Sequence, residues 1–307
     1  MSQQEQASIS DSPGDRSNPR IGTILPEFTS LDGEEKPKDE KFPTIIEFGK
    51  RLPIGYTDAQ GDKHVDFELV SWGWEIEEEL GKLIEEEPNM SIGQYMSEIV
   101  SRGLQRIGSI DFTKLKRSER RMIIHQMYYA DVLYCYVFIR LEGLGYQIRI
   151  KDLECPNCEN KVKDYTGDLR TIEVKALDEI PRKVVELEHG IEYAQGRRKR
   201  ITIGALKWAF MESDDPGVLV NPAKFRKQTI QHGIVSIEGA PAGAPIVITD
   251  KHLRSMKPVE INRIISQMSD LNGGPIMEIE GKCPKCKKSF AEVVDWRYSS
   301  FFGPSSL

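Results

Sequence analysis

The chain has 307 residues, a formal net charge of −6, 39% hydrophobic residues and 29% charged residues. This composition is typical of a globular protein with enough residues for two domains and a buried core. The negative charge argues against general affinity for nucleic acid, and the polar first 20 residues do not resemble a secretory signal peptide. Because no apolar run is long enough to cross a bilayer, we expect a cytoplasmic protein with no membrane partner.

The N-terminal part of the sequence divides into a polar tail and a β-rich segment. Residues 1–40 are rich in Ser, Gln, Asp, Glu, Pro and Lys, which predicts a disordered tail. We expect a strand at 42–48 and a hairpin made of 52–56 and 64–72 around a DAQG turn. An acidic helix follows over 74–87.

Helical patterns dominate the next segment. Ser91 and Gln94 have the spacing of a capping box, which predicts the start of a second helix. A third helix is expected over 119–142, stopped by a Gly-Leu-Gly sequence, and a strand over 146–153. In the second half, 183–206 reads as strands around a basic turn. An amphipathic helix is predicted over 259–271, because its apolar residues recur at helical spacing.

The sequence contains an internal similarity. KRSERRMIIHQM at 116–127 aligns with KPVEINRIISQM at 257–268 at an offset of 141, while two CPxC motifs align at an offset of 283 − 155 = 128. On this alignment the first copy carries 141 − 128 = 13 additional residues, which we assign to a longer helix. We predict an α+β fold of two tandem related domains, 41–180 and 181–307, after the tail. Chance agreement between two amphipathic helices is the alternative.

Two Cys-Pro-x-Cys motifs carry the strongest chemical signal. Two thiolates separated by two residues hold one metal ion, and four thiolates complete a structural zinc site of the zinc-ribbon kind. The predicted ligands of Zn²⁺ are therefore Cys155, Cys158, Cys283 and Cys286. Four thiolates leave no open position for water or substrate, so the site predicts no enzyme. It instead joins the two copies of the repeat.

Other readings of the cysteines stay open. Each motif could act as a thioredoxin-like dithiol, form a disulfide, or share a metal with a second chain. Five cysteines without a secretory signal favour reduced thiols. The remaining cysteine, Cys135, lies between two tyrosines on a predicted helix and is expected to be a small buried side chain.

The C-terminal end concentrates four aromatic residues, Trp296, Tyr298, Phe301 and Phe302. These rings either pack against the core or form an anchor for a partner protein, and we take the partner-binding role as the hypothesis to test. Elsewhere the sequence has no phosphate-binding loop, nucleophile elbow or HExxH motif, and the basic run at 197–200 is typical of a solvated turn.

Short motifs resemble a known family. LPIGY at 52–56, VEINRIISQM at 259–268, the following CPKC and the terminal FFGPSS at 301–306 are similar to the baseplate hub assembly, or tail assembly chaperone, proteins of T4-type contractile phages and related contractile injection systems. The resemblance implies a non-enzymatic role with baseplate, hub or other tail proteins as partners. It also implies a location in the host cytoplasm, the virion or an injection-system particle. The alternative is a zinc-ribbon nucleic-acid-binding regulatory protein; nucleic acid is an unlikely partner for an acidic chain.

Overall fold

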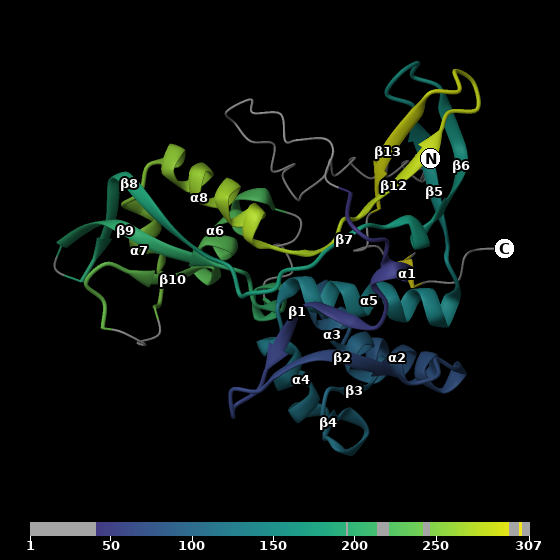
Figure 1. The fold of residues 1–307 in the computed structure, drawn as a ribbon, viewed down its shortest axis with the longest axis horizontal. Helices are drawn as coiled ribbons and strands as arrows, with labels where there is room; N and C mark the ends of the chain where they lie inside the picture. The colour runs from purple at the N-terminus through teal and green to yellow at the C-terminus, as the bar shows by residue number, and fades with distance from the viewer. Residues whose placement is uncertain (1–40, 195, 214–220, 242–245, 295–300, 303–307) are drawn as a thin grey trace, which may run out of the picture.

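The computed structural model describes residues 41–194, 196–213, 221–241, 246–294 and 301–302. These residues form a mixed α+β fold of helices and several small sheets (Figure 1). The α-helices are α1 Ile45–Phe48, α2 Trp74–Glu86, α3 Ile92–Gly103, α4 Arg117–Gln126, α5 Tyr129–Leu144, α6 Pro222–Gly233, α7 Asp250–Arg254 and α8 Pro258–Leu271. Three 3₁₀ turns are η1 Phe112–Lys114, η2 Leu169–Thr171 and η3 Trp208–Met211.

The strands of the described residues pair in an antiparallel manner. They are β1 Arg51–Thr57, β2 Lys63–Leu69, β3 Leu104–Ile107, β4 Ile110–Asp111, β5 Gln147–Glu154, β6 Lys161–Asp168, β7 Val174–Lys175, β8 Arg182–Tyr193, β9 Gly196–Gly204, β10 Ile234–Ile237, β11 Gly274–Pro275, β12 Glu278–Lys282 and β13 Ser289–Val293. No helix in the described part of the chain is both long and apolar enough to cross a membrane.

Two hairpin–helix units make up most of the fold. The first unit, 51–144, has a sheet of order β1-β2-β3-β4 with α2 to α5, and the second unit, 182–271, has a sheet of order β10-β9-β8 with α6 to α8. In Figure 1 the second unit forms the lobe on the left and the first unit the lower right part. One connected cluster of buried hydrophobic residues includes members from both units.

The helices of the two units follow one another in the same way. Helix α3 runs directly into β3 at Leu104 and α6 runs directly into β10 at Ile234, an offset of 234 − 104 = 130. Helices α5 and α8 begin at an offset of 258 − 129 = 129. A shorter helix precedes each of them, α4 before α5 and α7 before α8. A methionine follows each shorter helix, and its N–H donates to a carbonyl three residues earlier: Met127 to Ile124, and Met256 to Leu253.

A buried carboxylate fixes the first strand of each hairpin. The register of β1 shifts between Arg51 and Tyr56, and that of β8 shifts between Glu186 and Ile191. Inside each irregular stretch lies a glycine with positive φ, +99° at Gly55 and +75° at Gly190. Their N–H groups cannot join the ladder there, so a carboxylate of the packed helix accepts them instead.

In the first unit that carboxylate is Asp131, which accepts from Ile54 N–H at 2.8 Å and from Gly55 N–H at 3.1 Å. In the second unit it is Glu260, which accepts from His189 N–H at 2.7 Å and from Gly190 N–H at 3.1 Å. The two carboxylates lie at an offset of 260 − 131 = 129, the same as the helix starts.

Two expectations from the sequence are wrong. The segment 42–48 is not a strand, because Thr44 and Glu47 form a capping box that starts α1. The single helix expected over 119–142 is two helices, α4 and α5. Met127 and Tyr128 between them are extended, and Tyr128 forms an antiparallel bridge with Lys207. In this bridge the Met127 carbonyl accepts from Trp208 N–H, and Tyr129 N–H donates to the Leu206 carbonyl. Tertiary pairing therefore overrides the continuous helical pattern.

The break changes the interpretation of the repeated sequence motif. Lys116–Glu119 and Lys257–Glu260 are both capping boxes at helix starts, of α4 and α8. The helix that leads into the first CPxC motif is α5, however, not α4. The similarity at offset 141 therefore reflects a shared helix-start pattern, and the 13 residues are not an extension of one helix.

Candidate metal centre

The two CPxC motifs occupy the turns of two β-hairpins that lie together. Strands β5 and β6 flank the first motif, and β12 and β13 flank the second. The two hairpins stand side by side and project from the molecule at the upper right of Figure 1. We call this pair of hairpins the ribbon. Buried and exposed residues alternate along β12, which fits a thin two-layer structure with one buried face.

Both turns have the same backbone geometry. The N–H of Cys155 donates to Asn160 O at 3.0 Å, and the N–H of Cys283 donates to Lys288 O at 3.0 Å. The residue after the second cysteine of each motif has positive φ, which lets the chain return within one tight turn. Each turn therefore directs two sulfurs to the same side.

The four sulfurs form a compact cluster. The Sγ atoms of Cys155, Cys158, Cys283 and Cys286 all lie within 4.8 Å of one another. Across the two hairpins, Cys155 and Cys286 are 3.8 Å apart and Cys158 and Cys283 are 3.7 Å apart. A tetrahedral zinc ion with Zn–S bonds of about 2.3 Å requires sulfurs about 3.8 Å apart, whereas a disulfide requires about 2.05 Å. The spacing fits a tetrahedral metal and excludes disulfides.

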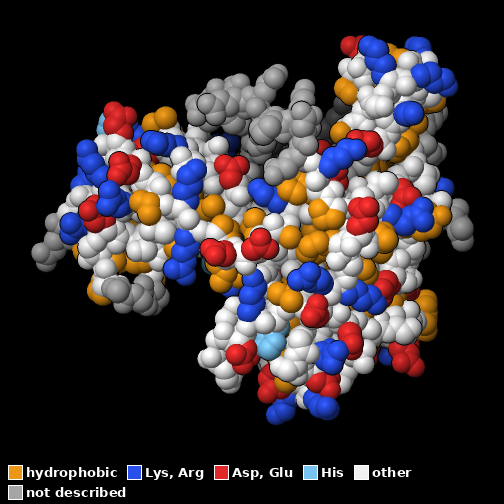
Figure 2. All heavy atoms as spheres, in the orientation of Figure 1, with side chains coloured by type: hydrophobic (Ala, Val, Ile, Leu, Met, Phe, Trp, Pro, Cys, Tyr) orange, Lys and Arg blue, Asp and Glu red, His pale blue; other side chains and the backbone are white. Residues whose placement is uncertain are grey.

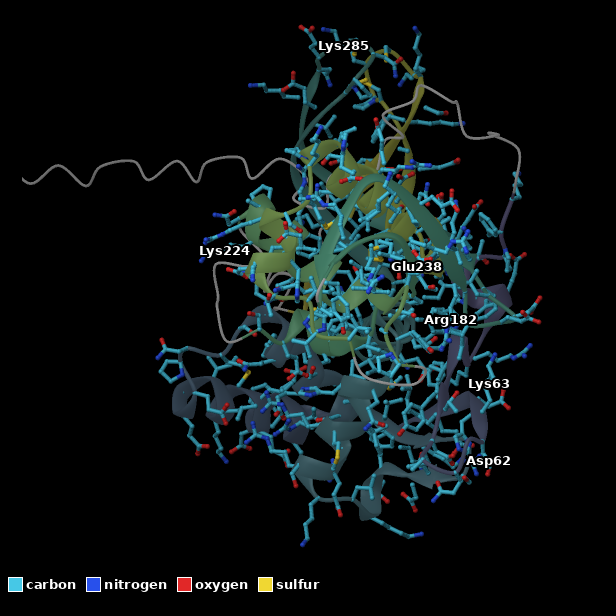
Figure 3. The ribbon with its side chains drawn as sticks, turned by 90° about the vertical axis from the view of Figure 1, so that its left-hand side faces the viewer. Asp62, Lys63, Arg182, Lys224, Glu238 and Lys285 are labelled. Atoms are coloured by element: carbon cyan, nitrogen blue, oxygen red, sulfur yellow. The ribbon has the colours of Figure 1, made fainter. Side chains whose placement is uncertain are left out.

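The electrostatics of the cluster differ between its cysteines. The N–H of Asn160 lowers the pKa of Cys158, but burial and the hydrogen bonds of the neighbouring cysteine sulfurs outweigh it and raise that pKa to about 11. Backbone N–H groups of Cys286 and Lys285 lower the pKa of Cys283 to about 6. A thiol with such a pKa is ionised at neutral pH, which is the form that binds a metal. A divalent ion with four thiolates carries a net charge of −2, and the exposed side chains of Lys282, Lys285 and Lys287 on the second hairpin offset it. Figure 3 shows Lys285 at the tip of the ribbon, and Figure 2 shows basic side chains gathered there.

A small hydrophobic cluster supports the sulfurs from below. Leu153 and Phe290 are buried with Cys155 and Cys283, and the ring of Tyr165 packs edge-on against Phe290. Two hydrogen bonds join the hairpins directly: Asn157 Nδ2 donates to Ser289 O at 3.3 Å, and the Tyr165 hydroxyl donates to the Glu280 carbonyl at 3.3 Å. The ribbon is therefore one packed body that needs residues from both halves of the chain.

The cysteine prediction is confirmed in its geometry. The structure brings together Cys155, Cys158, Cys283 and Cys286 and leaves Cys135 outside, fully buried in α5. Burial raises the pKa of Cys135 well above its ordinary value, as expected for a packing residue.

The aromatic end of the chain has a different role from the one hypothesised. Phe301 is 0% exposed and stacks on Tyr136 of α5 at 5.2 Å between ring centroids, and its carbonyl accepts from Arg140 Nε at 2.6 Å. Phe302 packs against Trp72 at 5.5 Å. These two rings cover the first unit, so the partner-binding hypothesis is wrong for Phe301, which has no exposed surface. Trp296 and Tyr298 lie outside the described residues.

Sequence reasoning missed the buried carboxylates. Asp131 was visible only as a charge inside an apolar run, and Glu260 only as an identity in an alignment. Burial raises the pKa of Asp131 to about 7, while the N–H groups of Ile54 and Gly55 and the cation of Lys207 oppose that rise. Burial also lowers the pKa of Lys207 to about 8. A charge inside an apolar helical run is the signal that could have identified Asp131 as the acceptor for Ile54 and Gly55.

Comparison of the chain with protein-family models, with curated proteins and with solved structures finds no match.

Proposed function

We propose that this chain is a non-catalytic assembly protein whose two related hairpin–helix units are held together by a structural zinc ion in the ribbon. The observation that carries the proposal is the set of four cysteine sulfurs, drawn from motifs 128 residues apart (283 − 155) and placed at tetrahedral spacing. Such a site has no open coordination position, so its use is to fix structure. Metal binding then contributes directly to the free energy of folding.

The two units are copies of one ancestral unit on this proposal. Matched offsets of 129 and 130 at the helices, the irregular first strand in each hairpin and the carboxylate that accepts from each glycine support it. Duplication explains why each copy supplies one half of the metal site. It also places the two half-sites opposite each other without a second chain.

The clients of the assembly protein are baseplate or hub proteins of a contractile tail. The support for this step is the resemblance of LPIGY, VEINRIISQM, CPKC and FFGPSS to tail assembly proteins. Co-expression of the tagged chain with baseplate, hub and sheath proteins, followed by affinity purification, tests it. We expect a baseplate or hub protein to co-purify with the zinc-loaded chain, and less of it with a chain whose four ribbon cysteines are serine. Recovery of none of them would contradict the role.

The second candidate is a zinc-ribbon protein that binds nucleic acid. The observation that favours it is the group of exposed lysines on the second hairpin, Lys282, Lys285, Lys287 and Lys288. Fluorescence anisotropy with DNA and RNA oligonucleotides at low and high salt distinguishes the two functions. Nucleic-acid binding by these lysines should weaken as salt rises and should be lost in a Lys285→Glu, Lys287→Glu variant.

A further inference from the structure

The first unit carries a groove filled by a segment of the second half of the chain. Trp208 of η3 is buried against α3, where its Nε1 donates to Ser97 Oγ at 2.6 Å, and its ring stacks on Tyr129. Four residues later, Glu212 inserts a carboxylate between α3 and α4. The segment Trp208–Glu212 therefore presents an aromatic ring and an acid to this groove, which we call the first groove.

A guanidinium, an imidazole and a hydroxyl hold the acid. Arg121 Nη2 lies 3.0 Å from the Glu212 carboxylate, the imidazole of His125 contacts it, and Ser97 Oγ donates to it. Burial raises the pKa of Glu212, but these groups outweigh burial and hold that pKa below its usual range. The Glu212 carboxylate is therefore charged at neutral pH while it lies between α3 and α4.

Among the described residues, the second unit has an unfilled groove at the matched place. A cavity of about 560 Å³ lies between α6, α7 and α8, with a floor of Ile230, Leu253 and Ile261 and a rim of Arg226, Lys227 and Arg254. We call it the second groove. Asp250 also lines the rim; Lys227 pairs with it at 2.7 Å, and Lys227 and Arg254 both lower the pKa of this acid.

The second groove corresponds to the first position by position. The residue numbers of the two units differ by 130 in α6 and by 129 in α7 and α8. With these offsets, the groove residues Lys227 and Ile230 of α6 correspond to Ser97 and Val100. Leu253, Arg254 and Ile261 correspond to Ile124, His125 and Val132. Ser97 and His125 are two of the groups that hold Glu212. Val100, Ile124 and Val132 are fully buried in the first unit, whereas their counterparts line a cavity in the second.

One difference constrains what can enter the second groove. A Cβ on Gly93 of α3 would lie 1.9 Å from the carbonyl oxygen of Met211, so the filled groove needs glycine there. The matched residue in α6 is Ala223 (223 − 130 = 93). The methyl group of Ala223 prevents the backbone of a bound segment from approaching α6 as closely as the Met211 backbone approaches α3. A large side chain must therefore bridge the gap to the apolar floor.

The chain itself displays a segment of the required chemistry. Trp74, the first residue of α2, is 76% exposed, the largest exposed fraction among the large hydrophobic residues of the described chain. Glu75 and Glu77 follow it in the first turn and α2 continues with further glutamates. The segment follows the first hairpin as Trp208–Glu212 follows the second. We infer that the second groove binds the Trp74–Glu77 segment of a second copy of this chain, with the indole on the apolar floor and the carboxylates at Arg226 and Arg254.

This contact is between two different surfaces, so it is heterologous. Each chain offers one acidic Trp74 segment and one second groove, and copies can therefore join head to tail into a ring or a short filament. The inference does not depend on the metal or on the tail-assembly role. Opposite charges on the two surfaces favour the same pairing, because α2 is acidic and the groove rim is basic.

Sedimentation velocity of the full zinc-loaded chain over a range of concentrations tests the inference. The wild type should self-associate as concentration rises. Trp74→Ala and Arg254→Glu should each weaken association about thirtyfold, as expected for loss of an interface hot spot. Ile84→Ala on α2 and Lys224→Glu on α6, which leave both surfaces intact (Lys224 is labelled in Figure 3), should associate as the wild type does.

An equal mixture of the Trp74→Ala and Arg254→Glu chains gives the decisive result. One chain retains an intact groove and the other an intact Trp74 segment, so the mixture should form a dimer that neither variant forms alone. A wild type that stays monomeric at every concentration would overturn the inference. So would a mixture that stays monomeric, or a Trp74→Ala chain that associates like the wild type. A groove that captures another protein in a chain that never self-associates also overturns it.

Discussion

The two hairpin–helix units share their internal supports but differ in how much of the remaining chain covers them. The first unit receives Trp208–Glu212 in its groove and Phe301–Phe302 on α5, both from the second half of the chain. In the described part of the chain, the second unit has no matching segment in its groove. The carboxylate at the irregular strand is kept in both, because an unpaired buried N–H is costly wherever the strand bends. The two units therefore share the contact that holds the backbone and differ in what covers their surfaces.

The largest expected effect concerns the ribbon, where the two halves contribute equally. Cys155→Ser and Cys283→Ser should each lower the free energy of unfolding by about 5 kcal/mol, the scale for opening a cross-link that closes a loop of more than 100 residues. The double variant should cost little more, because either change already disrupts the site. Chemical denaturation checks the stabilities, and elemental analysis should find about one zinc per chain.

Additive losses in the double variant would contradict a single shared site. So would a chain that holds zinc after all four ribbon cysteines have been replaced.

The next effect concerns pH and the buried carboxyl group of Asp131 in the first unit. The folded-state pKa of Asp131, about 7, lies above its unfolded value near 3.8. The folded state therefore binds this proton more tightly, and the associated stability is full below pH 4 and is lost as the pH rises through 7. Asp131→Asn mimics the protonated acid, so it should match the wild type only below pH 4. At pH 5 it should already be more stable by about 2 kcal/mol, and the difference should grow to about 4 kcal/mol above pH 7.

Thermal unfolding of both proteins from pH 5 to pH 7.5 measures this difference. The window stays below the point at which Lys207, with its pKa of about 8, loses its own proton. Parallel stability curves for the wild type and Asp131→Asn would show that the carboxylate stays ionised in the folded protein.

The third effect concerns Phe301, which packs on the first unit. Phe301→Ala should lower the free energy of unfolding by about 3 kcal/mol, because it empties a buried site beside Tyr136. Deleting 303–307, with Phe301 and Phe302 retained, is the control and should have little effect. Denaturant unfolding gives both values. Wild-type stability in Phe301→Ala would mean that the ring contributes to binding another protein instead of to the core.

The smallest pair of effects compares the two grooves directly. Gly93→Ala should destabilise the protein by about 2 kcal/mol, because its methyl group collides with the Met211 carbonyl in the filled groove. Ala223→Gly, the matched change in the open groove, should cost only about 1 kcal/mol from helix propensity. Urea unfolding of the two variants measures both. Equal effects would indicate that the first groove is no more tightly occupied than the second.

Local sequence signals predicted much of the fold because they are encoded by near neighbours. The capping box at Ser91 and Gln94, the hairpin around the DAQG turn and the helix over 259–271 all appear where expected. The clustering of the four cysteines was also predicted, since a CPxC turn is local and two such turns are needed for one tetrahedral site.

What escaped prediction depends on contacts between distant residues. The break between α4 and α5 exists because Met127 and Tyr128 pair with Leu206–Trp208, about 80 residues away. The equivalence of Asp131 and Glu260 was hidden because a different helix start, at Lys116, gives the better sequence match. Burial of Phe301 likewise requires knowing that the chain returns to α5.

The placement of the ribbon cysteines has a consequence for synthesis on the ribosome. Cys155 and Cys158 leave the exit tunnel first. The cluster of four cysteines stays incomplete until Cys283 and Cys286 have also left it. A prematurely terminated chain carries two exposed thiols and cannot retain the ion with four ligands. A metal held by all four thiolates, as proposed, therefore requires that synthesis has passed residue 286.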